Sequence, residues 1–209
     1  MQGQHSSYIT QQEYLELERQ AETKSEYWNG EIHPMGRVNV QHSLITTNAI
    51  ANLGLQLRKN PCTVYTGNLR LKVSSTGLYT YADVIVVCGQ ARIENEDNLL
   101  NPTVIVEVFS KSTESYDRGT KFEHYRTMEL LTDYLLISQD TAWIEHRSRQ
   151  QDDKWLLSIY QGLNSVTPIP SIGCELPLAE VYEKVEWSSE DAAHGWLRFV
   201  KEPSEAYLT

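Results

Sequence analysis

The residues best placed to do chemistry lie in one stretch of the chain, Asn101 to Arg126. It opens with an apolar, β-branched run, Thr103 to Phe109, which only Glu107 interrupts. Such a run is typical of a strand inside a sheet. A lone ionised carboxylate in apolar surroundings costs several kcal/mol or takes up a proton. We therefore expect Glu107 to meet a cation, a second metal ligand or a cleft.

Asp83 repeats this pattern, because it lies directly before an apolar run in the strand predicted over Tyr79 to Cys88. If this strand and that of Glu107 are neighbours, their backbones lie about 4.8 Å apart and both carboxylates could share one divalent cation. Oxygen ligands without nitrogen or sulfur favour magnesium or manganese over zinc. The structural alternative is that each acid caps a turn or pairs with an arginine at the sheet edge.

Lys121 is the third candidate, on a helix predicted from about Thr113 to Glu129. Asp117, Lys121 and Tyr125 are spaced i, i+4 and i+8 and so share one face of that helix. A lysine near a metal-bound water could position the nucleophile and stabilise negative charge developing on phosphorus. The alternative is a solvated surface lysine paired with Asp117.

Two weaker candidates lie upstream. His42 begins an amphipathic helix predicted over Gln41 to Lys59 and could face the same cleft, or it could simply pack at the helix start. Glu31 follows the Asn29-Gly30 hairpin signal and, like Tyr125, either lines the site or completes the structure around it.

The remaining patterns predict the scaffold. A capping box at Thr10 to Glu13 begins a helix that runs to about Ala21. Three apolar runs of the kind found in buried strands indicate a sheet covered on both faces, in an α/β or α+β fold. We expect an acidic loop at 94–98, a turn-rich segment at 167–177 and a weak helix at 192–200. Further strands are predicted at 62–65, 69–73, 133–138, 142–147 and 154–160.

Composition narrows the classes of protein. The 209 residues carry a net charge of −10, no apolar run long enough to span a bilayer and no signal peptide pattern. Three widely separated cysteines argue against a disulfide framework or a zinc site, so we expect a reducing cytoplasm. The acidic balance argues against a large nucleic-acid surface, but four cations gather near Glu107 and allow a local one: Lys111, Arg118, Lys121 and Arg126.

Three motifs together resemble the Uma-type (DUF820-like) restriction endonuclease family. They are Y-A-D-V-I-V-V-C from Tyr81, N-P-x-V-I-V-E-V-F-S from Asn101, and Y-D-R-G-x-K-F-x-x-Y-R from Tyr116. The likeness extends over roughly Glu13 to Gln161. It implies a PD-(D/E)XK nuclease-like fold, in which a central mixed sheet is flanked by helices, here with an extra N-terminal helix and hairpin.

The resemblance also implies roles for single residues. Asp83 and Glu107 match the two acidic positions and would hold Mg²⁺ or Mn²⁺ together with the Val108 carbonyl. The superfamily lysine would fall at Phe109, and Lys121 matches the position to which families of this type move it. We expect a disordered N-terminus at 1–9, the nuclease-like domain at 10–165 and an acidic C-terminal extension at 166–209.

Two departures from the family pattern lie beside the site. Ala82 replaces the proline expected before the first acid, which loosens the backbone there but removes no ligand. Lys111 replaces a proline after Ser110 and adds a cation that could compete with Lys121 for its role.

These observations predict a metal-dependent endonuclease that hydrolyses phosphodiester bonds in DNA. Cutting both strands of a duplex is easiest for a homodimer with two-fold symmetry. Two alternatives remain open. One is a degenerate member of the fold that binds DNA or a protein partner without cleavage, and the other is a metal-dependent hydrolase of a small phosphate ester.

Overall fold

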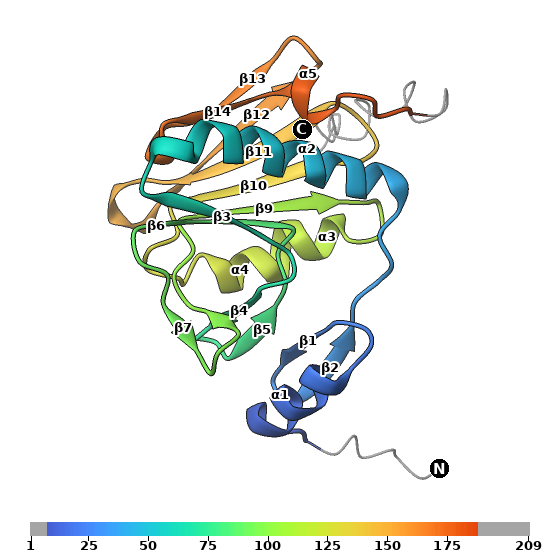
Figure 1. Ribbon diagram of the computed structural model, residues 1–209, viewed down its shortest axis with the longest axis vertical. Helices are drawn as coiled ribbons and strands as arrows, with labels where there is room; N and C mark the ends of the chain where they lie inside the picture. Colours follow the sequence, from blue (N-terminus) through green and yellow to red (C-terminus); the bar gives the residue numbers. More distant parts are fainter. Residues whose placement is uncertain (1–7, 188–209) are drawn as a thin grey trace, which may run out of the picture.

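The computed structural model describes residues 8–187, which form one α+β unit around a mixed central sheet (Figure 1). The strand order of this sheet is β12-β11-β10-β9-β6-β3, and β9 and β10 are parallel while the other neighbours are antiparallel. Its strands are β3 (Cys62–Thr66), β6 (Val84–Cys88), β9 (Val104–Phe109), β10 (Asp133–Ser138), β11 (Trp143–Arg149) and β12 (Trp155–Gln161).

Both faces of the central sheet are covered, because alternate residues of β6, β9 and β10 enter two different apolar cores. Helix α2 (Val40–Gln56) crosses one face, beside the hairpin β13 (Val166–Ile169) and β14 (Cys174–Pro177) and the short helix α5 (Leu178–Val181). The other face meets α3 (Glu114–Tyr116), a π-helical turn at Asp117–Lys121, and α4 (Phe122–Tyr125). The expected helix-flanked mixed sheet is confirmed.

A second sheet, which the sequence did not predict, has the order β2-β1-β5-β4-β8-β7. It joins the predicted N-terminal hairpin to strands from the middle of the chain. Helix α1 (Gln11–Gln20) begins with the expected capping box at Thr10, and Tyr14 packs between Tyr27 and Tyr79 of this sheet. The strands are β1 (Ser25–Trp28), β2 (Glu31–Pro34), β4 (Arg70–Val73), β5 (Leu78–Thr80), β7 (Ile93–Glu94) and β8 (Asn98–Leu99).

Several predicted boundaries were wrong. The single strand expected over Tyr79 to Cys88 is two strands, since the chain leaves the second sheet after Thr80 and enters the central sheet at Val84. The helix expected to reach Glu129 ends at Tyr125, after which the chain turns back towards β10. The segments expected as loop or turn at 94–98 and 167–177 contribute to β7, β8, β13 and β14.

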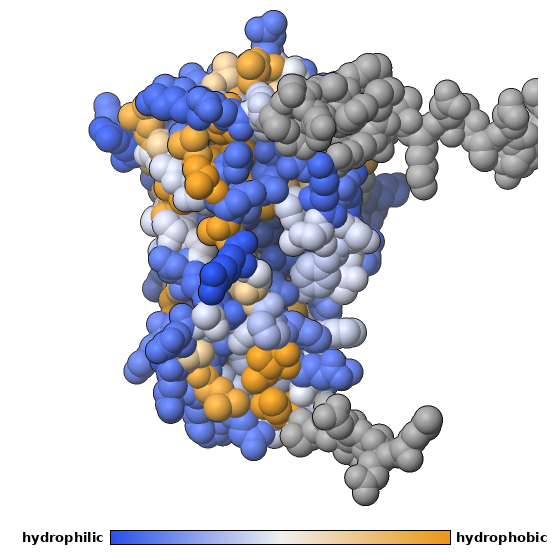
Figure 2. All heavy atoms as spheres, turned by 90° about the vertical axis from the view of Figure 1, so that its right-hand side faces the viewer, coloured by the Kyte–Doolittle hydropathy of each residue, from blue (hydrophilic) through white to orange (hydrophobic). Residues whose placement is uncertain are grey.

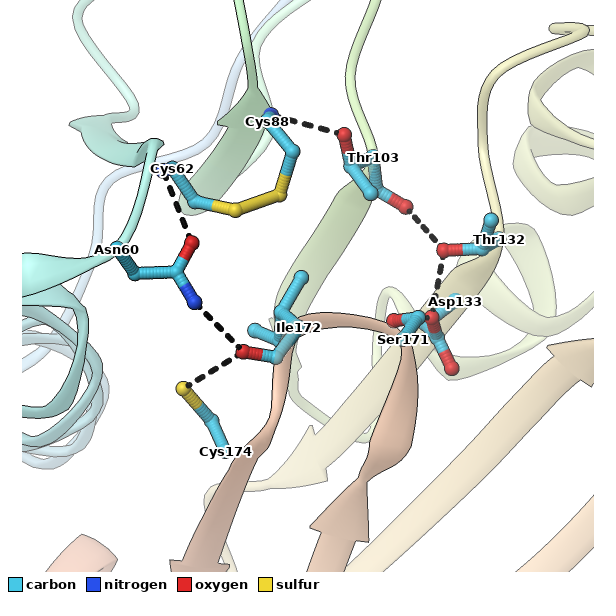
Figure 3. The surroundings of a disulfide bond; sticks show 9 residues. All are labelled: Asn60, Cys62, Cys88, Thr103, Thr132, Asp133, Ser171, Ile172 and Cys174. Atoms are coloured by element: carbon cyan, nitrogen blue, oxygen red, sulfur yellow. Dashed lines mark hydrogen bonds between the residues drawn. A yellow bond between two sulfur atoms is a disulfide. The ribbon is translucent and has the colours of Figure 1, made fainter.

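The cysteines were expected not to form a disulfide framework, and for one pair of them this prediction was wrong. Cys62 and Cys88 face each other across β3 and β6 and form a disulfide, while Cys174 is free and buried (Figure 3). The antiparallel register brings two cysteines 26 positions apart together, which cysteine spacing alone does not reveal. Between residues 8 and 187 no helix is long and apolar enough to cross a membrane. The weak helix expected at 192–200 lies outside the described residues, as do most of the N-terminal segment and the end of the acidic extension.

Candidate functional site

Asp83 and Glu107 both line one cavity at the same end of two neighbouring strands, with Glu107 inside β9 and Asp83 directly before β6. Val84 pairs with Val106 and Ile85 with Ile105 in the antiparallel ladder of β6 and β9, and this register, continued by one residue beyond the start of β6, brings Asp83 level with Glu107. Asp83 lies where the chain passes from one sheet to the other, and its Oδ2 accepts the Val108 N–H at 2.7 Å. The Asp83 carboxylate therefore accepts the hydrogen bond that a backbone carbonyl would accept if β6 extended further.

Lys121 is buried beside Glu107 and is not a surface lysine. Its side chain is 5% exposed, and its Nζ lies 2.9 Å from Oε1 of Glu107 and 3.9 Å from Oδ1 of Asp117. Both Asp117 and Lys121 belong to the π-helical turn, a rare local structure that occurs mostly within α-helices and often at functional sites. The predicted shared face is also present, since the Tyr125 hydroxyl, one helical turn further on, donates to Oε1 of Glu107 at 2.9 Å.

Glu26 belongs to the same cluster, and the sequence reasoning missed it. Its Oε1 lies 3.3 Å from Nζ of Lys121 and accepts the Thr80 hydroxyl, while its Oε2 accepts the Tyr116 hydroxyl at 2.7 Å. The available signal was a lone acid between Ser25 and Tyr27 in a predicted hairpin strand. That signal was weak, because one strand of a hairpin often faces solvent.

The cluster has more negative than positive charge. Burial raises the pKa of Glu107 to about 8, and the negative charges of Asp83 and Asp117 add to the rise, which Lys121 only partly offsets. Burial also raises the pKa of Asp117. For Lys121 burial acts to lower the pKa, but the surrounding acids outweigh it and the pKa lies well above its usual value. A buried site with this charge distribution favours the uptake of a proton or a further cation.

Of the weaker candidates, the structure brings His42 to the site as well as Tyr125. Nε2 of His42 lies 3.2 Å from Oδ2 of Asp83, because Asn39 caps α2 and starts the helix beside the strand end. Glu31 is exposed, and its Oε2 lies 3.8 Å from Nε2 of the likewise exposed His33. Lys111 is exposed and does not line the cavity at the site, and Phe109 is buried in the apolar core.

The site opens into a hollow under the segment that joins β2 to α2. This central cavity has a volume of about 350 Å³ and is lined by residues that include Arg37, His42, Asp83, Glu107 and Lys121. The joining segment lies on the right of Figure 1, and Figure 2 views the molecule from that side, with mainly hydrophilic residues around the hollow.

The oxygens around the central cavity suit a hard cation. Hydrogen bonds and ion pairs engage Oδ2 of Asp83 and Oε1 of Glu107, whereas Oδ1 and Oε2 have no such partner among the described residues. The carbonyl of a strand residue points to the same side as its N–H, so the Val108 carbonyl faces Asp83. Within residues 8–187 no three His, Cys, Asp or Glu side chains could hold a metal ion as a group. Two carboxylates, one carbonyl and several waters match the usual surroundings of Mg²⁺.

The fold has a solved counterpart. It is similar to the crystal structure of a protein from Anabaena variabilis titled a putative nuclease belonging to DUF820, with a TM-score of 0.70 and 18% sequence identity. The match covers 85% of this chain and 99% of that one. The α+β domain thus has the fold of that protein.

Residues 11–179 match the family model described as a putative restriction endonuclease, Uma2, and the chain belongs to this family. Two proteins of Synechocystis sp. are relatives at 33% and 32% identity, named uncharacterized protein sll1609 and uncharacterized protein slr1290. The first match covers 75% of this chain and 90% of the relative, and the second covers 83% and 91%. The resemblance inferred from the three sequence motifs is therefore confirmed.

Proposed function

We propose that this protein is a metal-dependent endonuclease that hydrolyses phosphodiester bonds in DNA. The observation that carries the proposal is the register of β6 and β9, which sets Asp83 opposite Glu107 with the Lys121 ammonium 2.9 Å from Glu107. Membership in a family described as a putative restriction endonuclease, and the fold shared with a putative nuclease, support a nuclease-like activity on a nucleic acid.

Asp83, Glu107 and the Val108 carbonyl would hold one Mg²⁺ or Mn²⁺ ion. When bound, such an ion acts as a Lewis acid towards the phosphate and lowers the pKa of a bound water. Lys121 would orient the attacking water and stabilise the negative charge that develops on the phosphate oxygens. Tyr125 and Glu26 hold the Glu107 carboxylate and the Lys121 ammonium in place, so they are positioning residues.

The substrate backbone has a path to this site. A second cavity, of about 570 Å³, adjoins the central cavity and shares Arg37, His42 and Asp83 with it. It is also lined by Lys24 and by the hydroxyl-bearing Thr46 and Thr47. Cations and hydroxyls are the side chains that contact phosphates. Such a local patch can bind a nucleic-acid backbone although the whole chain has a net charge of −10.

The test is cleavage of plasmid and single-stranded DNA in Mg²⁺ or Mn²⁺. We expect cleavage by the wild type and a loss of at least about a hundredfold in Asp83→Asn and in Lys121→Met, the scale for removing one group that stabilises the transition state. Asp152→Asn is the matched control, because Asp152 lies in an exposed turn with a positive φ that asparagine also tolerates.

Two other outcomes would contradict the proposal. DNA binding without cleavage under either metal indicates a degenerate member of the fold, an alternative that the acidic surroundings of Lys121 favour. Hydrolysis of a small phosphate ester without any effect on DNA indicates a different hydrolase. Calorimetry with Mn²⁺ separates the metal site from activity, since Asp83→Asn should weaken metal binding and Asp152→Asn should not.

A further inference from the structure

A third cavity, mainly apolar, also adjoins the central cavity. This apolar cavity has a volume of about 480 Å³. Its walls come from the β1-β2 hairpin, from β5 and from the segment of α3 and α4, and its large side chains are Trp28, Pro34, Met35, Leu78 and Tyr116. Trp28 is 42% exposed, and its ring rests edge-on against that of His124, with ring centroids 5.3 Å apart.

The apolar cavity and the central cavity share a wall. Met35, Gly36, Thr113, Asp117 and Lys121 line both. The Lys121 ammonium lies between the two, 3.3 Å from Glu26 in the apolar cavity and 2.9 Å from Glu107 in the central cavity. A group held against the ammonium therefore has the apolar cavity on one side and the Asp83 carboxylate on the other.

We propose that the apolar cavity binds a nucleobase of the strand whose phosphate occupies the central cavity. This inference rests on the proposed function. Bases stack on exposed aromatic side chains whatever their sequence, and Trp28 and Tyr116 supply such rings. The exposed Thr113 and Thr120 can exchange hydrogen bonds with a base edge. The neighbouring cavities thus match a nucleotide, with cations and hydroxyls on the backbone side and aromatic rings on the base side.

This assignment defines the substrate class. A base inside a duplex is stacked and paired, so it can enter the apolar cavity only after leaving the stack, which costs free energy. Single-stranded DNA and locally unpaired or mismatched DNA do not have to meet that cost. We therefore assign the protein a preference for unpaired strands over intact duplex.

The experiment measures binding without turnover. A short oligothymidylate with one 2-aminopurine is titrated with wild-type protein in EDTA and again in Ca²⁺, and the fluorescence of the 2-aminopurine is followed. We expect quenching on stacking, affinity roughly tenfold or more lower in Trp28→Ala, and most of the affinity kept in Trp28→Phe. Replacing the 2-aminopurine by an abasic site should weaken binding by a similar factor. The matched control is Leu157→Ala, because Leu157 is an exposed apolar residue of the edge strand β12.

Each outcome decides the inference. Equal affinity of Trp28→Ala and wild type, equal affinity for the base and the abasic oligonucleotide, or no binding at all overturns it. Base-dependent binding without cleavage in Mg²⁺ or Mn²⁺ supports it and contradicts the proposed function. Cleavage that treats duplex and single strand alike, and that Trp28→Ala leaves unchanged, overturns the base cavity and leaves the nuclease standing. Thermal melting of each variant confirms that it is folded.

Discussion

A buried carboxylate lies at each end of strands β6 and β9, and the two carboxylates differ in how many hydrogen-bond donors they meet. At one end lie Asp83, Glu107 and the central cavity. At the other end lie the Cys62–Cys88 disulfide and a hydrogen-bonded network around Asp133, the first residue of β10 (Figure 3). Both ends have a carboxylate that is almost completely buried, since Glu107 is 4% exposed and Asp133 is 2% exposed.

The difference lies in the donors that meet each carboxylate. Asp133 hydrogen-bonds with Nε2 of His146 at 2.6 Å, accepts the Thr132 hydroxyl at 2.7 Å, and also accepts that of Ser171. Burial acts to raise its pKa, but these hydrogen bonds outweigh burial and the pKa is lowered. Glu107 meets one hydroxyl and one ammonium shared with other acids, and its pKa rises to about 8. A buried acid with enough donors stabilises the fold, whereas one without them is poised to bind a cation.

The largest expected loss of unfolding free energy follows substitution of Lys121, at the end of the strands that carries Glu107. Lys121→Met removes the cation shared by Glu26, Glu107 and Asp117, and leaving buried charges without a partner costs about 3–5 kcal/mol. The loss should be greater at pH 8 than at pH 5, because the acids can take up protons at low pH. Urea unfolding at both values measures it, with the exposed Lys59→Met as control. An equal loss at pH 5 and pH 8 would contradict the electrostatic explanation.

The next largest expected loss of unfolding free energy follows removal of the disulfide, at the other end of the strands. The double variant Cys62→Ser, Cys88→Ser should lose about 3 kcal/mol of unfolding free energy, since the bond closes a loop between positions 26 apart. Mn²⁺ affinity should stay unchanged, because Cys88 and Asp83 flank opposite ends of β6. Urea unfolding and calorimetry measure the two quantities. A reductant should destabilise the wild type alone, and weaker Mn²⁺ binding in the variant would show that the two ends are coupled.

Asp133→Asn tests the network at the same end, with an expected loss of about 1–3 kcal/mol, the cost of leaving buried hydrogen-bonding groups unsatisfied. Because the folded pKa of Asp133 is lowered, its ionisation stabilises the protein above the unfolded pKa. That contribution disappears as pH falls through the folded value. Melting temperatures from pH 7 down to pH 3 should therefore converge for the variant and the wild type. A constant difference would mean that the network acts without the charge.

Glu107→Gln is the matching substitution at the candidate site, and its effect on the pH dependence of stability should have the opposite sign. The folded pKa is raised to about 8, so the protein loses stability as pH rises from the unfolded pKa towards 8. In EDTA the variant should become more stable relative to the wild type over that range, and its free energy of unfolding should exceed that of the wild type by about 1–2 kcal/mol at pH 8. This difference is smaller than the full pKa shift of Glu107 implies, because the amide attracts Lys121 more weakly. If melting in EDTA shows a variant less stable than the wild type at pH 8, Glu107 is already satisfied without a metal.

Much of the fold could be predicted from local patterns. The capping box at Thr10 and the Asn29-Gly30 turn mark the first helix and the hairpin, and both form where expected. The apolar runs of β6, β9 and β10 identify the central sheet, because a strand covered on both faces must be apolar throughout. The second sheet could not be predicted in the same way, since its strands are short and come from distant parts of the chain.

For the candidate site, too, some features could be predicted from local patterns and others could not. The sequence by itself determined that Asp83 and Glu107 are acids in apolar runs, and that Lys121 shares a helix face with Asp117 and Tyr125, because these are properties of spacing within one segment. Only the tertiary structure decided that Asp83 stands opposite Glu107, that Glu26 joins Lys121, and that Cys62 meets Cys88. Register between strands is set by the packing of the whole core, which no single segment encodes.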